Sequence, residues 1–235
     1  NSSRKYYEVT FMKKKKLAVY GAGGFGREVA WLAQKIFDKN QEFEIVCFID
    51  DDPKICGTQF NDLKVLSLSQ AKKAHADLCV VSGIGVPNVR EKTIKKAIAA
   101  GFSFTTLIHP NVEMSPWIEI GEGTVICAGN ILTTNITLGK HVQINLDCTI
   151  GHDVVMEDYA TLAPGVHLSG YVHVGERVYI GTGAVIINGI KGKPIVIGKD
   201  AVIGAGTCVT KSIPPSETWV GVPAHLLRKN KEKYT

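Results

Sequence analysis

Residues 120–156 read IGEGTVICAGNILTTNITLGKHVQINLDCTIGHDVVM, and every sixth residue of this stretch is an apolar side chain of medium size. The series continues without a break to Ile186 and resumes from Ile197 to Val209. Four residues after most members comes a small or β-branched side chain, such as Val142. A period of six fits neither an α-helix nor a single long strand. It is the signature of a parallel β-helix, in which each hexad is one short strand followed by a turn.

Three hexads would complete one triangular coil of this β-helix. Residue i then stacks on residue i+18, about 4.8 Å away along the axis, which is the usual distance between paired strands. The apolar series fills the interior, and we expect the β-helix to span residues 109–228. Between Ile186 and Ile197 the spacing is eleven residues instead of twelve, so residues 188–194 are expected to loop out from a corner. Residues 229–235 are expected to form a polar tail.

The region before the hexads alternates short apolar runs with helical patterns. Strands are expected at 16–20, 45–49, 78–81 and 104–108, and amphipathic helices at 27–37 and 89–100. Such alternation is typical of a parallel sheet with crossover helices. We therefore expect a mixed fold, with a small Rossmann-like α/β domain over residues 12–108 joined directly to the β-helix. Residues 1–11 begin without methionine and are interpreted as a tag or a disordered extension.

A glycine-rich turn separates the first expected strand from the first helix. Gly21, Gly23 and Gly26 have the spacing of the dinucleotide fingerprint, in which glycines let the backbone approach phosphates at a helix N-terminus. Asp50 and Asp51 follow the second strand and can accept hydrogen bonds from ribose hydroxyls. Since the domain holds about one mononucleotide-binding half, we expect it to bind one nucleotide and the group attached to its diphosphate. An NAD-dependent oxidoreductase and a purely structural glycine turn remain alternatives.

Composition narrows the class of protein. The chain has 235 residues, a formal net charge of +5 and 21% charged residues, and its basic residues gather near the ends. A nucleic-acid-binding protein would need a basic face interleaved with aromatic residues, so no nucleic-acid partner is expected. No apolar run reaches the length of a transmembrane helix, so membrane insertion is not expected either. The six cysteines lack CxxC spacing, which favours reduced thiols in a cytoplasmic protein.

The histidines on the hexads could in principle hold zinc. A zinc hydratase built on a β-helix needs three convergent imidazoles. His167 and His173 occupy the same place in successive hexads, so one chain puts them on different faces of the coil. A neighbouring chain could add ligands, and the zinc hydratase is kept as an alternative, but no metal is expected.

His152 has a different setting. It follows a glycine and precedes Asp153, a carboxylate that can fix the imidazole tautomer and raise its basicity. Gly170 lies one coil further on, where its backbone N–H can approach the same site without side-chain obstruction. A base, a carboxylate that orients it and a neighbouring N–H are the parts that acyl transfer requires. A surface histidine at a corner of the coil is the alternative interpretation.

Several motifs along residues 16–228 together resemble one family. They are YGAGGFGRE at 20–28, FIDDD at 48–52, LIHP at 107–110, GHD at 151–153, APG at 163–165 and VGVPA at 220–224, with Asn145 and the pair Ser169-Gly170 between them. The chain is similar to the bacterial sugar O-acyltransferases and nucleotide-aminosugar N-acetyltransferases of the sialic-acid O-acetyltransferase type, a group that includes the acetyltransferase of bacillosamine biosynthesis. The resemblance implies a left-handed β-helix, a homotrimer with active sites between subunits, and acetyl-CoA as co-substrate without a metal.

The resemblance also implies roles for individual residues. The catalytic residues would be His152 as general base, Asp153 as its carboxylate and Gly170 as the N–H donor at the thioester. The acceptor would be bound by Gly21, Gly23, Gly24, Phe25, Asp50, Asp51, Gly83 and Asn145. Acetyl-CoA would be bound by Thr161, Gly170, Gly181, Thr182, Gly204 and Ala205.

Two positions depart from the pattern of that family, which usually has histidine in place of Phe25 and often in place of Thr161. Threonine can still donate a hydrogen bond, whereas phenylalanine cannot, so the departures bear on which acceptor is used. The expected activity is acetyl-CoA-dependent N-acetylation of a nucleotide-linked amino sugar, in the first place a UDP-4-amino sugar, for surface polysaccharide biosynthesis. The alternatives are an O-acetyltransferase acting on sialic acid or another polysaccharide sugar, and a non-catalytic nucleotide-sugar-binding protein.

Overall fold

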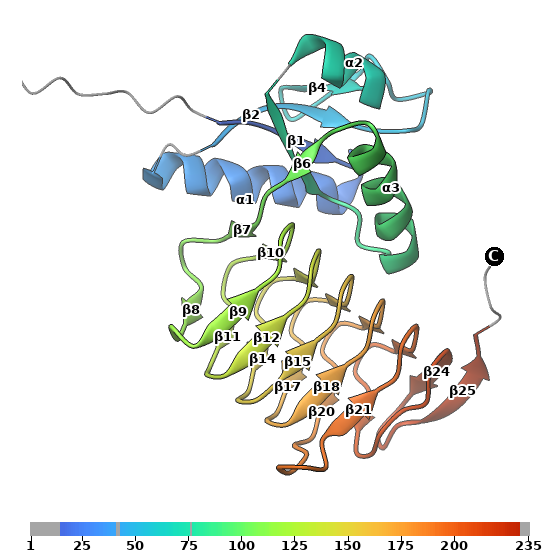
Figure 1. The fold of residues 1–235 in the computed structure, drawn as a ribbon. Coiled ribbons are helices and arrows are strands. Elements are labelled where there is room, and N and C mark those ends of the chain that lie inside the picture. The colour runs from blue at the N-terminus through green and yellow to red at the C-terminus, as the bar shows by residue number, and fades with distance from the viewer. Residues whose placement is uncertain (1–14, 41–42, 76, 231–235) are drawn as a thin grey trace, which may run out of the picture.

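The protein consists of a small α/β domain packed against the first coils of a β-helix (Figure 1). The computed structural model describes residues 15–40, 43–75 and 77–230. The expected extension at 1–11 and the end of the expected tail, from residue 231, lie outside the described residues. Within the described ranges, no helix is both long and apolar enough to cross a membrane.

The α/β domain is built on a six-stranded sheet with the order β3-β4-β2-β1-β5-β6. Its elements are β1 (Lys15–Tyr20), α1 (Gly24–Asn40), β2 (Phe43–Ile49), β3 (Gln59–Phe60), β4 (Leu63–Leu66), α2 (Leu68–Ala74), β5 (Leu78–Ser82), α3 (Pro87–Ala99) and β6 (Ser103–Phe104). Strand β1 pairs in parallel with both β2 and β5. The carboxyl ends of these three strands therefore meet at one edge of the sheet, where ligands bind in folds of this kind.

Some elements of this domain differ from the sequence-based expectation. Helix α1 begins at Gly24, three residues before the expected residue 27. The sequence did not indicate this start, because two of the first three helical residues are glycines, which are poor helix formers. Helix α2 and the β3–β4 hairpin were not expected. Helix α2 has 7 residues, too few for a periodic pattern. Ser67 and Gln70 nevertheless form a capping box at its start, and that spacing was a usable signal.

The β-helix is formed by three sheets of short, mostly parallel strands, which we call sheets I, II and III. Sheet I has the order β25-β24-β22-β19-β16-β13-β10-β7, sheet II β23-β20-β17-β14-β11-β8, and sheet III β21-β18-β15-β12-β9. The strands are β7 (Leu107–Ile108), β8 (Glu113–Met114), β9 (Ile118–Ile120), β10 (Val125–Ile126), β11 (Ile131–Leu132), β12 (Ile136–Leu138), β13 (Gln143–Ile144), β14 (Thr149–Ile150), β15 (Val155–Met156), β16 (Thr161–Leu162), β17 (His167–Leu168), β18 (Val172–Val174), β19 (Tyr179–Ile180), β20 (Val185–Ile186), β21 (Ile195–Ile197), β22 (Val202–Ile203), β23 (Cys208–Val209), β24 (Glu217–Val220) and β25 (His225–Lys229).

Stacking follows the eighteen-residue register. Val125 pairs with Gln143, which pairs with Thr161 one coil further on. The sixth-position side chains fill the interior, where Ile126 and Ile144 are 0% exposed. The expected fold class, a small Rossmann-like α/β domain followed by a left-handed parallel β-helix, is confirmed. The segments that turn from one sheet to the next are called corners I–II, II–III and III–I.

The expected strand at 104–108 is divided between the two domains. Phe104 belongs to β6 of the α/β sheet, whereas Ile108 lies in β7 and pairs with Ile126 of the β-helix. The six-residue series therefore begins at Ile108, two hexads before Ile120. The signal was present, because Ile108 and Met114 extend the six-residue series backwards from Ile120.

Two expectations concerned the C-terminal part of the β-helix, namely a loop at 188–194 and a polar tail from residue 229. The expected loop at 188–194 is present, closed by an antiparallel bridge between Ile190 and Lys193. Lys229, the first residue of the expected tail at 229–235, is the last residue of strand β25, which pairs antiparallel with β24. Asn230 is also held, since its backbone N–H donates to the Ser216 carbonyl at 2.7 Å. Strand β25 was not expected, because its sequence HLLRK shows no alternation of apolar and polar residues and it has one partner strand.

Arg90 of α3 joins the two domains and is 0% exposed. One terminal nitrogen donates to the carbonyls of Ile84 and Gly85 at 2.9 and 3.1 Å and to the Gln143 side chain at 2.7 Å. The other donates to the Thr161 hydroxyl at 2.9 Å and to the carbonyls of Tyr159 and Ala160. Burial lowers the pKa of Arg90 to about 9, so the guanidinium stays charged at neutral pH.

His141 lies beside Arg90 in the same interface and is 3% exposed. Its ring stacks on Tyr159 with centroids 5.4 Å apart and meets Phe104 edge-on at 5.0 Å. Burial, followed by the nearby Arg90 charge, lowers the pKa of His141 from 6.5 to about 4. The imidazole is therefore neutral in the folded protein at neutral pH.

Replacing His141 by phenylalanine should make the protein less sensitive to acid. Below pH 6.5 the unfolded chain binds a proton that the folded protein does not bind until about pH 4, so the free energy of unfolding falls as pH falls through this window. We expect this residue to account for about 2 kcal/mol of the loss. Denaturant unfolding at pH 7 and pH 4.5 measures it, with His225→Phe at an exposed histidine as control. Equal losses in wild type and His141→Phe would contradict the assignment.

Candidate active site

A cavity of about 460 Å³ opens at the carboxyl ends of β1, β2 and β5. Its walls come from the glycine turn, from the ends of β2 and β5, and from the first two turns of α3. The lining residues are Tyr20, Gly21, Gly23, Gly24, Phe25, Asp50, Asp51, Gly83, Ile84, Gly85, Val89 and Thr93. Every acceptor residue expected from the sequence lines this cavity except Asn145.

Two kinds of glycine meet in this cavity. A Cβ on Gly26 would overlap the Gly21 carbonyl, and a Cβ on Gly83 would lie 2.5 Å from the Gly26 Cα. These glycines let the start of α1 pack directly on the ends of β1 and β5. A Cβ on Gly23 or Gly24 would meet nothing within 4 Å. Their lack of a side chain leaves open space in front of the α1 N-terminus, where backbone N–H groups favour an anion.

The two carboxylates of the cavity have different roles. Asp50 accepts hydrogen bonds from the backbone N–H groups of Ala22 at 2.9 Å and Asp52 at 3.0 Å, so it shapes the glycine turn. Asp51 accepts a hydrogen bond from the Tyr20 hydroxyl at 2.9 Å and pairs with Lys96 at 2.6 Å. Burial, and then the hydrogen bond to Asp51, raise the pKa of Tyr20. Asp50 thus holds the glycine turn, while Asp51 joins side chains of β1 and α3 at the wall of the cavity.

Sequence reasoning missed the wall that α3 provides. Ile84 and Gly85 follow β5 directly, and Val89 and Thr93 lie on one face of α3. A usable signal existed, because residues just after a parallel strand and in the first turns of the next helix border the same edge of the sheet. Val89 is 48% exposed in spite of its apolar side chain, and it adds an apolar flank to the cavity.

His152 lies on corner II–III, between β14 and β15. Its Nδ1 is 2.8 Å from an Asp153 carboxylate oxygen, so the neutral ring holds its proton on Nδ1 and leaves Nε2 as a base. A Cβ on Gly170 would lie 2.5 Å from Nε2, so only glycine leaves room for the imidazole there. Among the described residues, the Gly170 N–H donates to no other group. The expected catalytic trio thus lies together.

The expected acetyl-CoA residues fall on a different corner. Gly181, Thr182, Gly204 and Ala205 lie on corner I–II in two successive coils, and the Gly206 N–H donates to the Thr182 carbonyl at 2.8 Å. The same corner carries Ala163-Pro164-Gly165 in the coil before, where the Gly183 N–H donates to the Pro164 carbonyl at 2.9 Å. These small residues form a continuous line of backbone on the wall of the β-helix, separated from His152 by sheet II.

Two expected site residues have other roles in a single chain. Thr161 is 1% exposed, and its hydroxyl donates to the Gly85 carbonyl at 3.2 Å while it accepts from Arg90. Asn145 is 8% exposed and its amide donates to the Leu162 carbonyl at 2.7 Å. Neither side chain is free to meet acetyl-CoA or a sugar in this arrangement. Thr161 belongs to the domain interface, a position that the hexad pattern alone cannot distinguish from a solvent-facing one.

The remaining histidines do not converge. His167 lies in sheet II with its Nδ1 2.8 Å from the Thr149 hydroxyl, and His173 lies in sheet III with its Nε2 2.9 Å from Glu157. The prediction that one chain keeps them on different faces is confirmed. In the part of the chain that the structure describes, no group of three His, Cys, Asp or Glu side chains is placed to hold a metal ion.

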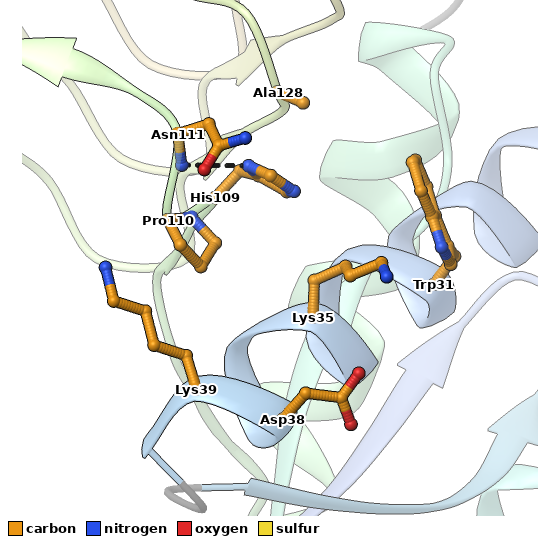
Figure 2. Close-up of a pocket in the computed structure, with 8 residues that line it drawn as sticks. All are labelled: Trp31, Lys35, Asp38, Lys39, His109, Pro110, Asn111 and Ala128. Atoms are coloured by element: carbon orange, nitrogen blue, oxygen red, sulfur yellow. Dashed lines mark hydrogen bonds between the residues drawn. The ribbon is translucent and has the colours of Figure 1, made fainter.

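A second cavity, of about 500 Å³, lies between α1 and the first coils of the β-helix (Figure 2). It is lined by Trp31, Lys35, Asp38, Lys39, His109, Pro110, Asn111 and Ala128. His109 accepts a hydrogen bond at Nδ1 from the Asn111 backbone N–H at 3.0 Å. Burial, and then the charges of Lys35 and Lys39, lower the pKa of His109. The sequence did not point to this cavity.

Comparison with known proteins agrees with this division into domains. Residues 16–97 match the family model of the PglD N-terminal domain. The GDP-perosamine N-acetyltransferase of Escherichia coli O157:H7 is 33% identical over 215 residues, which cover 90% of this chain and 96% of that protein.

Solved structures extend the likeness to the whole fold. WeeI from Acinetobacter baumannii AYE is 39% identical with a TM-score of 0.84, covering 90% of this chain and 99% of that one. PerB from Caulobacter crescentus, solved in complex with CoA and GDP-perosamine, is 28% identical with a TM-score of 0.79, covering 90% of this chain and 96% of that one.

The two kinds of glycine should respond differently to substitution. Gly26→Ala places a methyl group against the Gly21 carbonyl and should lower the free energy of unfolding by about 2 kcal/mol or more. Gly23→Ala adds a methyl group in open space and should leave stability within about 0.5 kcal/mol of wild type. Denaturant unfolding of the protein without ligand measures both. Equal stability of the two variants would contradict the proposed packing of α1.

Proposed function

The chain belongs to the hexapeptide-repeat family of nucleotide-aminosugar N-acetyltransferases, and on this premise we propose that it transfers an acetyl group from acetyl-CoA to the amino group of a nucleotide-linked amino sugar. The observation that carries the proposal is the setting of His152. Its Nδ1 is 2.8 Å from an Asp153 carboxylate oxygen, and its Nε2 lies 2.5 Å from the place that a Cβ on Gly170 would take. The names of similar proteins support the substrate class, since two of them include GDP-perosamine.

The acceptor binds in the cavity of the α/β domain. Its diphosphate lies in the open space before Gly23 and Gly24, where the α1 N-terminus favours negative charge. Asp51, held by Tyr20 and Lys96, accepts hydrogen bonds from the ribose. Phe25 gives the phosphate side an apolar neighbour in place of a hydrogen-bond donor. Both a UDP-linked sugar, expected from the sequence, and a GDP-linked sugar, favoured by the relatives, fit this description.

The reaction uses His152 as general base. The neutral sugar amine attacks the thioester carbonyl carbon, a C–N bond forms, and Nε2 of His152 takes the proton that the nitrogen loses. Asp153 stabilises the resulting imidazolium. The Gly170 N–H donates to the oxyanion of the tetrahedral intermediate. When the C–S bond breaks, the coenzyme A thiolate leaves and the proton on His152 returns to it. The products are the N-acetylated nucleotide sugar and coenzyme A.

One chain does not bring all these parts together, so the active site requires a second copy. His152 lies on corner II–III, and the line of Gly181, Thr182, Gly204 and Ala205 lies on corner I–II. Three copies arranged around an axis parallel to the β-helix bring corner II–III of one copy beside corner I–II of the next. Acetyl-CoA then lies between subunits, with its thioester at His152 and its remainder along the line of small residues.

The surface of the β-helix supports assembly through sheet II. The outward side chains at its strand starts are Glu113, Ile131, Thr149, His167, Val185 and Cys208, of which one carries a carboxylate. Corner III–I is densely charged, with Lys140, Asp158, Arg177 and Asp200 among its residues. A surface that becomes the core of a protein interface usually carries few charges and more apolar side chains than the rest of the surface. The homotrimer is therefore proposed to close around sheet II.

The reaction is tested directly with purified protein. Acetyl-CoA is offered with UDP-, GDP- or dTDP-linked amino sugars and, in parallel, with free sialic acid, and thiol release is followed together with the mass of the sugar product. We expect release only with a nucleotide-linked amino sugar, and an amide in the product. An acetyl ester on sialic acid would favour the O-acetyltransferase alternative. Binding of the nucleotide sugar without thiol release would favour the non-catalytic alternative.

His152→Ala should lower kcat by a factor of about 10² to 10⁴, the usual contribution of general base catalysis, and leave KM for both substrates nearly unchanged. His173→Gln is the matched control, because His173 is also a partly exposed histidine paired with a carboxylate but lies within strand β18 and is not one of the expected site residues. Steady-state kinetics at saturating acetyl-CoA measure both variants. Wild-type turnover by His152→Ala would refute the mechanism.

A further inference from the structure

The cavity between α1 and the first coils has an unusual lining for a gap inside one chain. Trp31 is 52% exposed, and the Lys35 ammonium lies 5.9 Å from its ring centroid. Among the described residues, neither Lys35 nor Lys39 pairs with a carboxylate within 4 Å. Figure 2 shows the His109 ring directed across the cavity toward α1. Aromatic and cationic groups thus line a space that is large enough for an aromatic side chain.

Trp117 is an exposed tryptophan near the same end of the β-helix. It lies on corner II–III of the first coil, between β8 and β9, and is 67% exposed. Its backbone N–H lies 3.4 Å from the Ser115 hydroxyl, and Ile118 beside it pairs with Ile136 in the regular ladder. The corner is therefore ordered while its largest side chain is left in solvent, an arrangement typical of side chains that anchor an interface.

The eighteen-residue register relates Trp117 to the active site. Trp117 precedes Asp153 on corner II–III by two coils, and Asn111 precedes Asp147 on corner I–II by two coils. Rotation about an axis parallel to the β-helix leaves the level of each coil unchanged. An arrangement that brings the His152 corner of one copy beside the Asp147 corner of the next therefore also brings Trp117 beside Asn111 and Ala128, which line the cavity.

We propose that this cavity receives the Trp117 side chain of a neighbouring copy of the chain, and that this contact sets the level at which the two copies meet. The proposal rests on the trimeric arrangement proposed above. The indole lies between Trp31 and His109, and the ammonium groups of Lys35 and Lys39 lie near its ring, where cation–π attraction favours them. Because the Trp117 indole enters at the first coil, it fixes the position of one copy relative to the other along the β-helix axis. His152 lies two coils further along that axis.

The contact gives Trp117 a positioning role. His152 must meet a thioester held by another copy, and a shift of about 1 Å between reacting groups is enough to slow an enzyme greatly. A face of stacked short strands such as sheet II resists sliding poorly, because its backbone repeats in every coil. One large side chain in one matching cavity removes that degeneracy. Trp117 thus acts on the reaction through the alignment of subunits and touches neither substrate.

A cross-linking experiment tests the contact. The double variant Trp117→Cys/Ala128→Cys, in the otherwise unchanged chain, is treated with a short bismaleimide and analysed on denaturing gels. We expect covalent trimers. The controls are wild type, each single variant, and Trp117→Cys/Glu122→Cys, whose second thiol lies on the charged corner III–I. The proposal would be overturned if the protein is a trimer by mass in solution but does not cross-link in the Trp117→Cys/Ala128→Cys variant. It would also be overturned if the Trp117→Cys/Glu122→Cys variant cross-links equally well.

A second experiment distinguishes a seated side chain from a bound small anion. In Ala128→Cys the thiol should react slowly with a maleimide, and in Trp117→Ser/Ala128→Cys it should react at least about tenfold faster. The proposal would be overturned if the maleimide reaction has the same rate in both variants and inorganic phosphate slows it in both. The cavity would then be assigned to an anion. Acetyl transfer by the wild-type enzyme is measured separately, so failure of the proposed reaction and failure of this contact give different results.

Discussion

The Arg90 guanidinium is the contact on which the arrangement of the two domains depends. Removing a charged group from water is costly, and the cost is offset here by carbonyl, amide and hydroxyl oxygens instead of a carboxylate. Those oxygens belong to the end of β5, to β13 and to β16. Because a planar guanidinium donates in fixed directions, it holds these segments in one geometry. Gln143 extends the contact, since its amide donates to the Ser82 carbonyl at 3.0 Å.

This contact has a consequence for the nucleotide cavity. Ile84 and Gly85, whose carbonyls bind Arg90, also line the cavity, and the same helix supplies Val89 and Thr93. Glu91 on the next position of α3 lies 3.2 Å from Arg177 of the β-helix. Helix α3 is therefore anchored to corner III–I of the β-helix as well as to sheet I. A sugar attached to a nucleotide in the cavity is delivered at a defined height along the β-helix, because neither domain can slide on the other.

In the proposed mechanism, the β-helix divides catalysis between its corners. The base and its carboxylate occupy corner II–III, where Asp153 adopts a positive φ of 57°, while small residues line corner I–II. A repeating fold favours this division, because each corner repeats along the axis and can be specialised independently of the others. In the proposed trimer, a complete site needs the corner of another copy. The proposed contact of Trp117 at the first coil would then align the subunits for catalysis.

The sequence alone determined the β-helix, the glycine turn and the His152–Asp153–Gly170 trio, because each depends on spacing along the chain. Strict periods of six and eighteen specify which residues stack, and the spacing of the glycines specifies a tight turn between a strand and a helix. It did not reveal the burial of Thr161, the α3 wall of the cavity or the strand β25. The burial of Thr161 depends on how the α/β domain packs on sheet I through Arg90, whereas the α3 wall forms within the α/β domain and β25 forms because the chain folds back on β24. The contact between Arg90 and Thr161 joins residues far apart in the chain, where no local period records it, so only the tertiary structure decided it.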